Sequence, residues 1–395
     1  MAQTAEPPRP PEDDEEERVF ARRVTFGIVA VMVAFAVMRA TRELPLATVI
    51  ICRIMQSASA RGGILLPNLD SPEDVKASRR RINSMQASAP QLIKGNLARV
   101  ANAVLFRGRG EKVGEVIPIR IYTPDSAGPA IAAGKASMRL PVLLLFHGGG
   151  FIYGDLDSVD GTARDLALAS GMVVVNVAYG LAPERKFPTA LKDCRAALAW
   201  VKENIHKYGG DPRRVAVVGE SAGGNLALTT ALAAIRKLPG LAHPLCAVVA
   251  VSPMTSHAHS VAGKGSYERY KEGYVLNAEM IELYWKAYLS KPSQGRRPLA
   301  SPLRAPLRWL RRLPPTTLLL AEHDVLYDEG AALGDRLRRA DPAGKGCHLV
   351  HTYNRTIHGF FGKMGLPSAK ESLLLAAVRV REACGPGATA AAAAV

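Results

Sequence analysis

Five short and almost uninterrupted apolar runs constrain the fold of this chain more than any other feature of its sequence. They occupy residues 140–146, 172–179, 214–219, 246–253 and 316–322. Amphipathic stretches, such as residues 188–205, separate most of them. Strands that are apolar on both faces are typical of a parallel sheet that helices cover on both sides. The pattern therefore predicts an α/β fold built on a mostly parallel, doubly wound sheet.

Composition divides the whole chain into regions of different character. We expect a disordered acidic segment (1–23), an apolar helix (24–55), a helical cap region (56–112), the α/β domain (113–384) and a low-complexity tail (385–395). The first segment is rich in proline and acidic residues, and such a segment cannot bury enough apolar surface to offset the entropy lost on ordering. Alternation of isoleucine with other residues over 116–121 predicts a half-exposed strand near the start of the α/β domain.

The apolar segment at residues 24–38 is a candidate membrane anchor. As a helix its 15 residues would extend about 22 Å, which is short of the roughly 30 Å hydrocarbon core of a bilayer. Arginines flank it on both sides, and residues 44–52 supply a second apolar patch, so it is suited to lie at the membrane interface. A helix docked on a partner is the alternative. A cleavable signal peptide fits less well, because no small-residue cleavage site follows the segment.

The net charge of +16 is unevenly distributed. Residues 1–17 hold seven acidic residues and one arginine, so the rest of the chain has 50 basic and 28 acidic residues, a net charge of +22. The densest basic patches are Arg79, Arg80 and Arg81, and the set Arg296, Arg297, Arg304, Arg308, Arg311 and Arg312. A solvated surface accounts for such patches, and contact with anionic lipid headgroups is the alternative. Because no nucleic-acid-binding motif accompanies the arginines, we expect no nucleic-acid partner.

The cysteines indicate neither a metal site nor a disulfide framework. They are odd in number, scattered and without Cys-x-x-Cys spacing: Cys52, Cys194, Cys246, Cys347 and Cys384. Zinc sites and disulfide scaffolds show closer or paired spacings. We therefore predict no bound metal, and the sequence leaves the redox compartment and the oligomeric state open.

A candidate nucleophile stands where one of the apolar runs meets a helix. Residues 219–223, Gly-Glu-Ser-Ala-Gly, lie between the run at 214–219 and an amphipathic stretch. In that context a Gly-x-Ser-x-Gly sequence forms a sharp strand-to-helix turn, which exposes the serine hydroxyl at the carboxyl end of the strand. Ser221 is therefore the candidate nucleophile, with a turn of purely structural role as the alternative.

A serine nucleophile needs a histidine base and an orienting carboxylate, which in this arrangement follow it along the chain. Asp324 comes just after the last apolar run, and His358 precedes a glycine 34 residues further on. We predict that these two residues complete a triad with Ser221. Asp328 is the alternative carboxylate, although it is also suited to cap the following helix. The remaining histidines considered are expected to be structural or exposed: His257, His259, His323 and His351.

Three consecutive glycines follow an apolar run and His147. The N–H groups of a glycine loop can approach an anion closely, either a nucleotide phosphate or a transient oxyanion. The chain has neither a G-x-x-x-x-G-K-[ST] nor a G-x-G-x-x-G sequence, so we expect no phosphate site and no cofactor. We predict an oxyanion hole formed by the N–H groups of Gly149, Gly150 and Ala222, with His147 and Gly148 supporting the loop.

Together these motifs resemble the hormone-sensitive lipase family of α/β-hydrolase esterases, which includes arylacetamide deacetylases and bacterial carboxylesterases. The likeness covers residues 113–383 and rests on HGGGFIYG, YGLAPERKFPTAL, GGDPRRVAVVGESAGGNLAL, EGYVLNAEMIELYWKAYL, ASPLRA, AEHDVLYDEG and IHGFF. It implies an α/β-hydrolase fold with a helical cap and ester hydrolysis through an acyl-enzyme. It also implies that Ser221 is the nucleophile, His358 the general base and Asp324 the orienting acid.

The resemblance extends to location. Anchored arylacetamide deacetylases begin with a similar apolar helix, which implies membrane association, with the endoplasmic reticulum as the candidate site and the cytoplasm as the alternative. The apolar amino-terminal segment and the basic surface indicate a small hydrophobic ester met at a membrane, such as a sterol acetate or a short glyceride, and its acyl length stays open. An amidase or deacetylase, a lipid-interaction protein and a non-catalytic small-ligand receptor of the same fold are alternatives. His358 disfavours the receptor, because receptors of this fold lack that histidine.

One departure from the family pattern concerns a loop near the site. The family usually has Asp-Tyr-Arg-Leu-Ala-Pro-Glu, but Ala178 and Gly180 replace its aspartate and arginine here. We expect this change to alter stability or pocket shape and to leave the triad intact.

Overall fold

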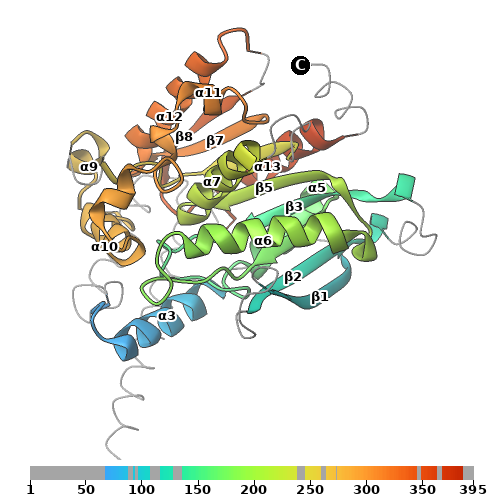
Figure 1. Cartoon of the computed structure of the whole chain (residues 1–395), viewed down its shortest axis with the longest axis horizontal. Helices are drawn as coiled ribbons and strands as arrows, with labels where there is room; N and C mark the ends of the chain where they lie inside the picture. Colours follow the sequence, from blue (N-terminus) through green and yellow to red (C-terminus); the bar gives the residue numbers. More distant parts are fainter. Residues whose placement is uncertain are drawn as a thin grey trace, which may run out of the picture. The chain divides into compact units, whose positions relative to one another are not determined.

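The apolar runs form strands of one eight-stranded sheet in a computed structural model of the chain. The structure describes residues 67–87, 92–93, 97–106, 116–127, 136–237, 245–258, 264–272, 274–344, 348–362 and 367–385. The strands are β1 (Leu97–Phe106), β2 (Val116–Pro124), β3 (Leu140–Phe146), β4 (Val173–Val177), β5 (Gly210–Glu220), β6 (Ala247–Val251), β7 (Thr316–His323) and β8 (Leu349–Ile357). They lie in the order β1-β2-β4-β3-β5-β6-β7-β8 (Figure 1).

Most of this sheet is parallel. Neighbouring strands pair in parallel from β4 through β3, β5, β6 and β7 to β8, whereas β2 is antiparallel to both β1 and β4. Every residue of β4 and β6 is buried, because helices cover both faces of the sheet. The predicted α/β fold with a mostly parallel, doubly wound sheet is confirmed.

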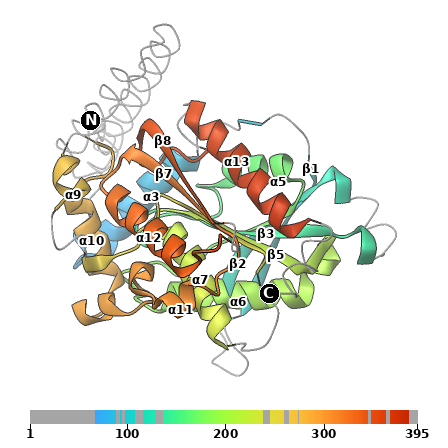
Figure 2. The same cartoon turned by 90° about the horizontal axis from the view of Figure 1, so that it is seen from above.

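The longer helices form a layer on each face of the sheet. α6 (Thr189–Asn204), α7 (Ala222–Lys237) and α12 (Tyr327–Ala340) pack on one face, and α5 (Asp160–Ser170) and α13 (Pro367–Cys384) cover the other (Figures 1 and 2). An apolar core fills the space on each side. The other helices are α3 (Pro72–Ala87), α9 (Ser266–Arg269), α10 (Ala278–Tyr288) and α11 (Leu307–Leu310). Short 3₁₀ turns occur at Asp125–Ala127, Ala136–Met138, Ile205–Tyr208, Pro292–Arg296 and Pro302–Arg304.

The region at 56–112, which the sequence predicts to be helical, is helical only in part. It contains α3, but residues 97–106 form β1 at the edge of the sheet. Val100 and Val104 are 39% and 53% exposed, so this strand carries no buried apolar run that would mark it in the sequence. The predicted disordered segment (1–23), the apolar helix (24–55) and nearly all of the tail (385–395) lie outside the described residues. Among the described helices, none is long and apolar enough to cross a membrane.

A disulfide joins Cys246 to Cys384, which corrects the expectation of no disulfide framework. The two residues are 138 positions apart in the sequence, so no local spacing reveals the pair. They meet because α13 packs against β6, which begins beside Cys246. Cys194 is a free, buried cysteine of α6.

Candidate active site

Ser221 occupies a strained turn between β5 and α7. Its φ of 57° lies in the left-handed region, which a non-glycine residue adopts only where the surroundings enforce it. Its N–H donates to Val251 O at 2.8 Å, and its carbonyl accepts from Asn225 N at 3.0 Å. Small neighbours make the turn possible, since a Cβ at Gly219 would lie 2.2 Å from Gly223 O, and one at Gly223 would lie 2.0 Å from Phe146 O. The predicted strand–turn–helix context of Ser221 is present.

His358 and Asp324 are in direct contact. His358 follows β8 and Asp324 follows β7, and His358 Nδ1 donates to Asp324 Oδ2 at 2.7 Å. Leu326 N donates to the other carboxylate oxygen at 2.9 Å, which fixes the orientation of the carboxyl group. The Asp324 side chain is 1% exposed, and this burial strengthens its interaction with the imidazole.

Glu220 connects the histidine loop to the serine turn. It immediately precedes Ser221, and its Oε1 accepts from Phe361 N at 3.3 Å, three residues beyond His358. The structure therefore brings the turn of Ser221 and the His358–Asp324 pair to the same edge of the sheet, at the carboxyl ends of β5, β7 and β8.

The charges around His358 determine its protonation. Burial lowers the pKa of His358, but attraction to Asp324, the hydrogen bond to Asp324 and attraction to Glu220 together raise it above its ordinary value of about 6.5. His358 is the predicted base, and a base accepts a proton only when neutral, so activity is expected above this pKa and should be lost as the pH falls through it.

Replacing Glu220 with glutamine tests this electrostatic contribution. Glutamine retains an oxygen that accepts from Phe361 N but removes the negative charge, so the pKa of His358 should fall. The acid limb of a plot of kcat/KM against pH should lie above pH 6.5 in the wild type and move to lower pH in Glu220→Gln. Each profile is normalised to its own high-pH plateau, and coincident limbs would contradict the prediction.

The glycine loop after β3 is shaped by close backbone approaches. Gly149 and Gly150 have φ values of 111° and 60°, which glycine adopts without strain. A Cβ at Gly149 would lie 2.5 Å from Tyr153 O, and one at Gly150 would lie 2.3 Å from the Tyr284 ring. The carbonyl of Gly149 accepts from the N–H groups of Ile152 and Tyr153 at 3.0 and 2.8 Å. Since a trans peptide holds C=O and N–H on opposite sides, the Gly150 N–H points away from these partners.

Two aromatic contacts support the loop. The His147 ring stacks on Tyr179 at 4.1 Å, its Nδ1–H donates to Gly148 O at 2.8 Å, and Tyr179 OH donates to His147 O at 2.7 Å. The Phe151 ring is buried and stacks on Tyr288 of α10 at 3.7 Å. The Phe151 side chain therefore packs against α10 and fixes this end of the loop.

Comparison with known proteins places these features in a family. The family model for the alpha/beta hydrolase fold matches residues 143–362, more than half of the chain. The chain belongs to this family. Within it, the resemblance to hormone-sensitive lipase-like carboxylesterases is confirmed.

Several curated and solved relatives of this α/β-hydrolase are named esterases. It is 37% identical to the ethyl acetate hydrolase of Pseudomonas putida over 58% of this chain and 68% of that protein. It is 34% identical to esterase LipI of Mycobacterium tuberculosis over 65% and 75% of the respective chains. A thermostable esterase of Pseudomonas putida superposes with a TM-score of 0.70 at 29% identity, over 85% of this chain and 97% of that one. A Pyrobaculum calidifontis esterase gives a TM-score of 0.67 at 32% identity, over 84% and 97%.

Two side chains of helix α3 form hydrogen bonds with the backbone of the glycine loop in this α/β-hydrolase. Arg79 Nε donates to Ile152 O at 2.8 Å, and its Nη1 and Nη2 donate to both oxygens of Glu184 at 3.0 and 2.9 Å. Asn83 Oδ1 accepts from Gly154 N at 2.8 Å, and its Nδ2 donates to Asp155 at 2.8 Å. In the sequence Arg79 is one of three consecutive arginines, and nothing local distinguishes it from its neighbours.

Because the glycine loop is the predicted oxyanion hole, Arg79→Met is expected to reduce kcat about ten- to a hundredfold with a smaller effect on KM, since a misplacement of about 1 Å can cost up to about a hundredfold. Arg79→Lys should not restore the rate, because an ammonium group cannot reproduce the guanidinium's forked contacts. Arg80→Met removes an exposed neighbouring charge and serves as the control. Steady-state kinetics on an activated ester measure the effect, and wild-type kcat in Arg79→Met would contradict it.

At Gly180, where the chain departs from the family pattern, neighbouring side chains occupy the space that a larger residue would need. Gly180 N donates to Asp193 Oδ2 at 2.9 Å, and a Cβ at Gly180 would lie 2.5 Å from Arg185 Cδ. A larger residue at 180 would have to displace Arg185, so this loop has its own packing in place of the usual family residues.

The alternative carboxylate and the other described histidines have partners other than His358 and Asp324. Asp328 accepts from Ser266 N at 2.7 Å and pairs with Arg269 at 2.9 Å. It lies in the first turn of α12, whose N-cap is Leu326, so Asp328 is not the cap that the sequence suggested. Of the other histidines, His323 packs against Tyr270 and Tyr274, His351 is exposed, His257 packs on Trp285, and His259 lies outside the described residues.

Proposed function

We propose that this chain, which is a serine carboxylesterase-like hydrolase, cleaves small hydrophobic esters through an acyl-enzyme formed on Ser221. The observation that supports this most strongly is the 2.7 Å contact between His358 and a buried Asp324, beside the strained turn that carries Ser221. Such a turn, base and carboxylate are the parts that serine acyl transfer requires.

In the proposed mechanism, the Ser221 hydroxyl attacks the ester carbonyl carbon while the unprotonated ring nitrogen of His358, Nε2, takes its proton. Asp324 holds the other nitrogen protonated and stabilises the imidazolium that forms. The N–H groups of Gly149, Gly150 and Ala222 stabilise the oxyanion, with His147 and Gly148 supporting their loop. His358 then gives the proton to the departing alcohol, and a water molecule that His358 activates releases the acid from Ser221.

Covalent labelling tests the proposal directly. An alkyl p-nitrophenyl phosphonate should release one equivalent of p-nitrophenol per chain, and peptide mass spectrometry should locate the adduct on Ser221. A protein that binds a small ligand tightly but is not labelled would be a receptor of the same fold. Turnover of matched ester and amide substrates separates an esterase from an amidase, and faster amide cleavage would overturn the assignment.

The substrate class is proposed from the aromatic residues that pack against the glycine loop. Aromatic residues of α10 pack against it: Tyr284 over Gly150, and Tyr288 and Trp285 against Phe151. These bulky rings favour an apolar substrate with a short acyl group. Kinetics across an acyl series from acetate to decanoate should show kcat/KM highest for the short chains, and a maximum at decanoate would refute this preference.

Membrane association through residues 24–38 is a further part of the proposal, and these residues lie outside the described ones. Their apolar composition and flanking arginines support an interfacial anchor, with the endoplasmic reticulum as the proposed location and the cytoplasm as the alternative. Cell fractionation with and without residues 1–55 tests this. The full-length chain should sediment with membranes and the shortened chain should not, whereas a full-length chain found wholly in the supernatant would refute the anchor.

A further inference from the structure

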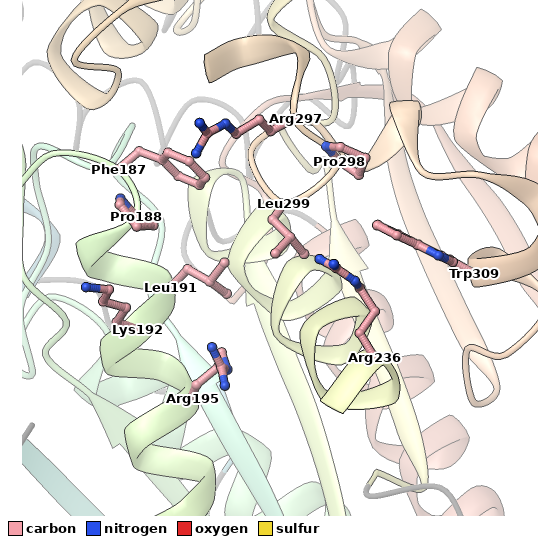
Figure 3. A pocket seen from close by; sticks show the side chains of 10 residues that line it. All are labelled: Phe187, Pro188, Leu191, Lys192, Arg195, Arg236, Arg297, Pro298, Leu299 and Trp309. Carbon is pink, nitrogen blue, oxygen red and sulfur yellow. The ribbon is translucent and has the colours of Figure 1, made fainter. Parts of the chain in front are cut away.

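A groove on the α6–α7 face of the molecule has apolar walls and a cationic rim. It has a volume of about 470 Å³, which is within the range of small-molecule sites. Leu191, Leu299 and Trp309 contribute to its walls. Figure 3 shows Leu191 and Leu299 in the middle of the groove, with Lys192 and Arg195 of α6 on one side and Arg236 of α7 and Trp309 of α11 on the other.

Four cationic side chains surround this groove: Lys192, Arg195, Arg236 and Arg297. Within the part of the chain that the structure describes, none of them has a carboxylate within ion-pair distance. Arginines elsewhere do, as Arg120 has Asp157 and Asp160. The rim therefore carries a concentrated positive charge that forms no ion pair with a described acidic side chain.

The rim is partly preorganised. The Arg236 guanidinium lies over the Trp309 ring at 4.4 Å from its centroid, a cation–π contact that holds it at the groove wall. Leu191 and Arg195 are four residues apart on α6, so one helix face presents an apolar contact and a charge together. Such a preorganised guanidinium binds a carboxylate at lower entropic cost than a free one.

We propose that this groove is a second binding site, separate from the Ser221 site, for a single-chain amphipathic anion such as a fatty-acid carboxylate. The carboxylate binds among the arginines, and the alkyl chain lies along Leu191, Leu299 and Trp309. An uncharged chain leaves the rim unpaired, and a small anion leaves the apolar walls empty, so both parts of the ligand are required. A concave groove of this size accommodates one chain and does not match a flat bilayer surface.

One residue that lines the groove also contacts the aromatic rings that pack against the glycine loop. Phe187 lines it, and the Phe187 ring meets the Tyr288 ring edge-on at 5.6 Å, while Tyr288 stacks on Phe151. Phe187 N also donates to Tyr288 O at 2.7 Å. No residue that lines the groove belongs to the candidate triad or to the glycine loop, so occupancy of the two sites can be measured separately.

Isothermal titration calorimetry of the full-length chain with decanoate, below its micellar concentration, tests the proposal. Protein first labelled at Ser221 with the phosphonate should still bind one decanoate. Arg236→Gln combined with Arg297→Gln should weaken binding at least about tenfold. The matched control is Lys370→Gln with Arg381→Gln on α13, which removes the same charge from the opposite face of the sheet and should leave the affinity unchanged.

Further ligands identify what the groove recognises. Decanol and acetate should each bind at least about tenfold more weakly than decanoate. If the double arginine variant bound decanoate as tightly as the wild type, the proposal would be overturned. Loss of decanoate binding on phosphonate labelling would also overturn it, because that result would place decanoate in the candidate active site. Binding to anionic vesicles without binding to monomeric decanoate would overturn it in favour of a membrane surface. If the protein resists labelling, the proposed catalytic function fails, and the arginine comparison still decides the groove.

Discussion

Ser221→Ala is expected to lower kcat/KM for p-nitrophenyl butyrate by at least about four orders of magnitude. The hydroxyl is the proposed site of the acyl intermediate, and no neighbouring side chain can supply an equivalent nucleophile in that turn. Any remaining rate would come from the oxyanion donors and from positioning of the ester. Progress curves at high enzyme concentration measure it, and loss of the phosphonate adduct should accompany the loss of rate.

The control for this variant is structural. The left-handed φ at residue 221 is unfavourable for alanine as it is for serine, so the backbone cost is nearly the same in both chains. Thermal unfolding of Ser221→Ala should therefore match the wild type closely, and Ser293→Ala, which changes an exposed serine, should keep full activity. Retention of wild-type turnover in Ser221→Ala would end the acyl-enzyme proposal.

Asp324→Asn is expected to reduce kcat by about 10⁴-fold. The amide presents either an N–H group or a weaker acceptor to His358 Nδ1, so it no longer selects the tautomer whose other nitrogen accepts the serine proton. It also removes the charge that raises the pKa of His358. The acid limb of any residual activity should therefore move to lower pH than in the wild type.

Asp328→Asn is the matched control, because the sequence offers both aspartates as the triad acid. Asp328 interacts with Ser266 and Arg269, away from His358. Its replacement should change kcat only a few-fold, while lowering stability through the contacts of α9. If Asp328→Asn were the inactive variant and Asp324→Asn the active one, the assignment of the orienting acid would be wrong.

The central strands could be predicted from the sequence because their environment is uniform. Helices bury β4 and β6 on both faces, so each appears as a continuous apolar run, and the predicted run at 140–146 coincides with β3. The edge strand β1 was missed for the opposite reason. Its pairing with β2 depends on backbone hydrogen bonds, and its exposed valines give no buried stripe to detect.

The candidate site likewise combines local sequence patterns, which could be predicted, with contacts between distant residues, which could not. The serine turn, the glycine loop and the order of Asp324 and His358 are local patterns, so the sequence could propose them, although their catalytic roles stay predictions. Glu220, Arg79 and the Cys246–Cys384 pair act across distances of up to 141 residues in the chain, and only the folded structure brings their partners together. The contact between Phe151 and Tyr288 of α10 likewise joins residues that are far apart in the sequence.

The hydrogen bonds from α3 to the glycine loop bear on how enzymes of this kind diverge. The family match begins at residue 143, whereas Arg79 and Asn83 belong to a helix that precedes it. Two descendants with identical sequences from 143 to 362 could thus differ in turnover through one inherited substitution in α3. Selection can then tune the rate at positions outside the family signature, and comparing only the shared segment would miss the cause.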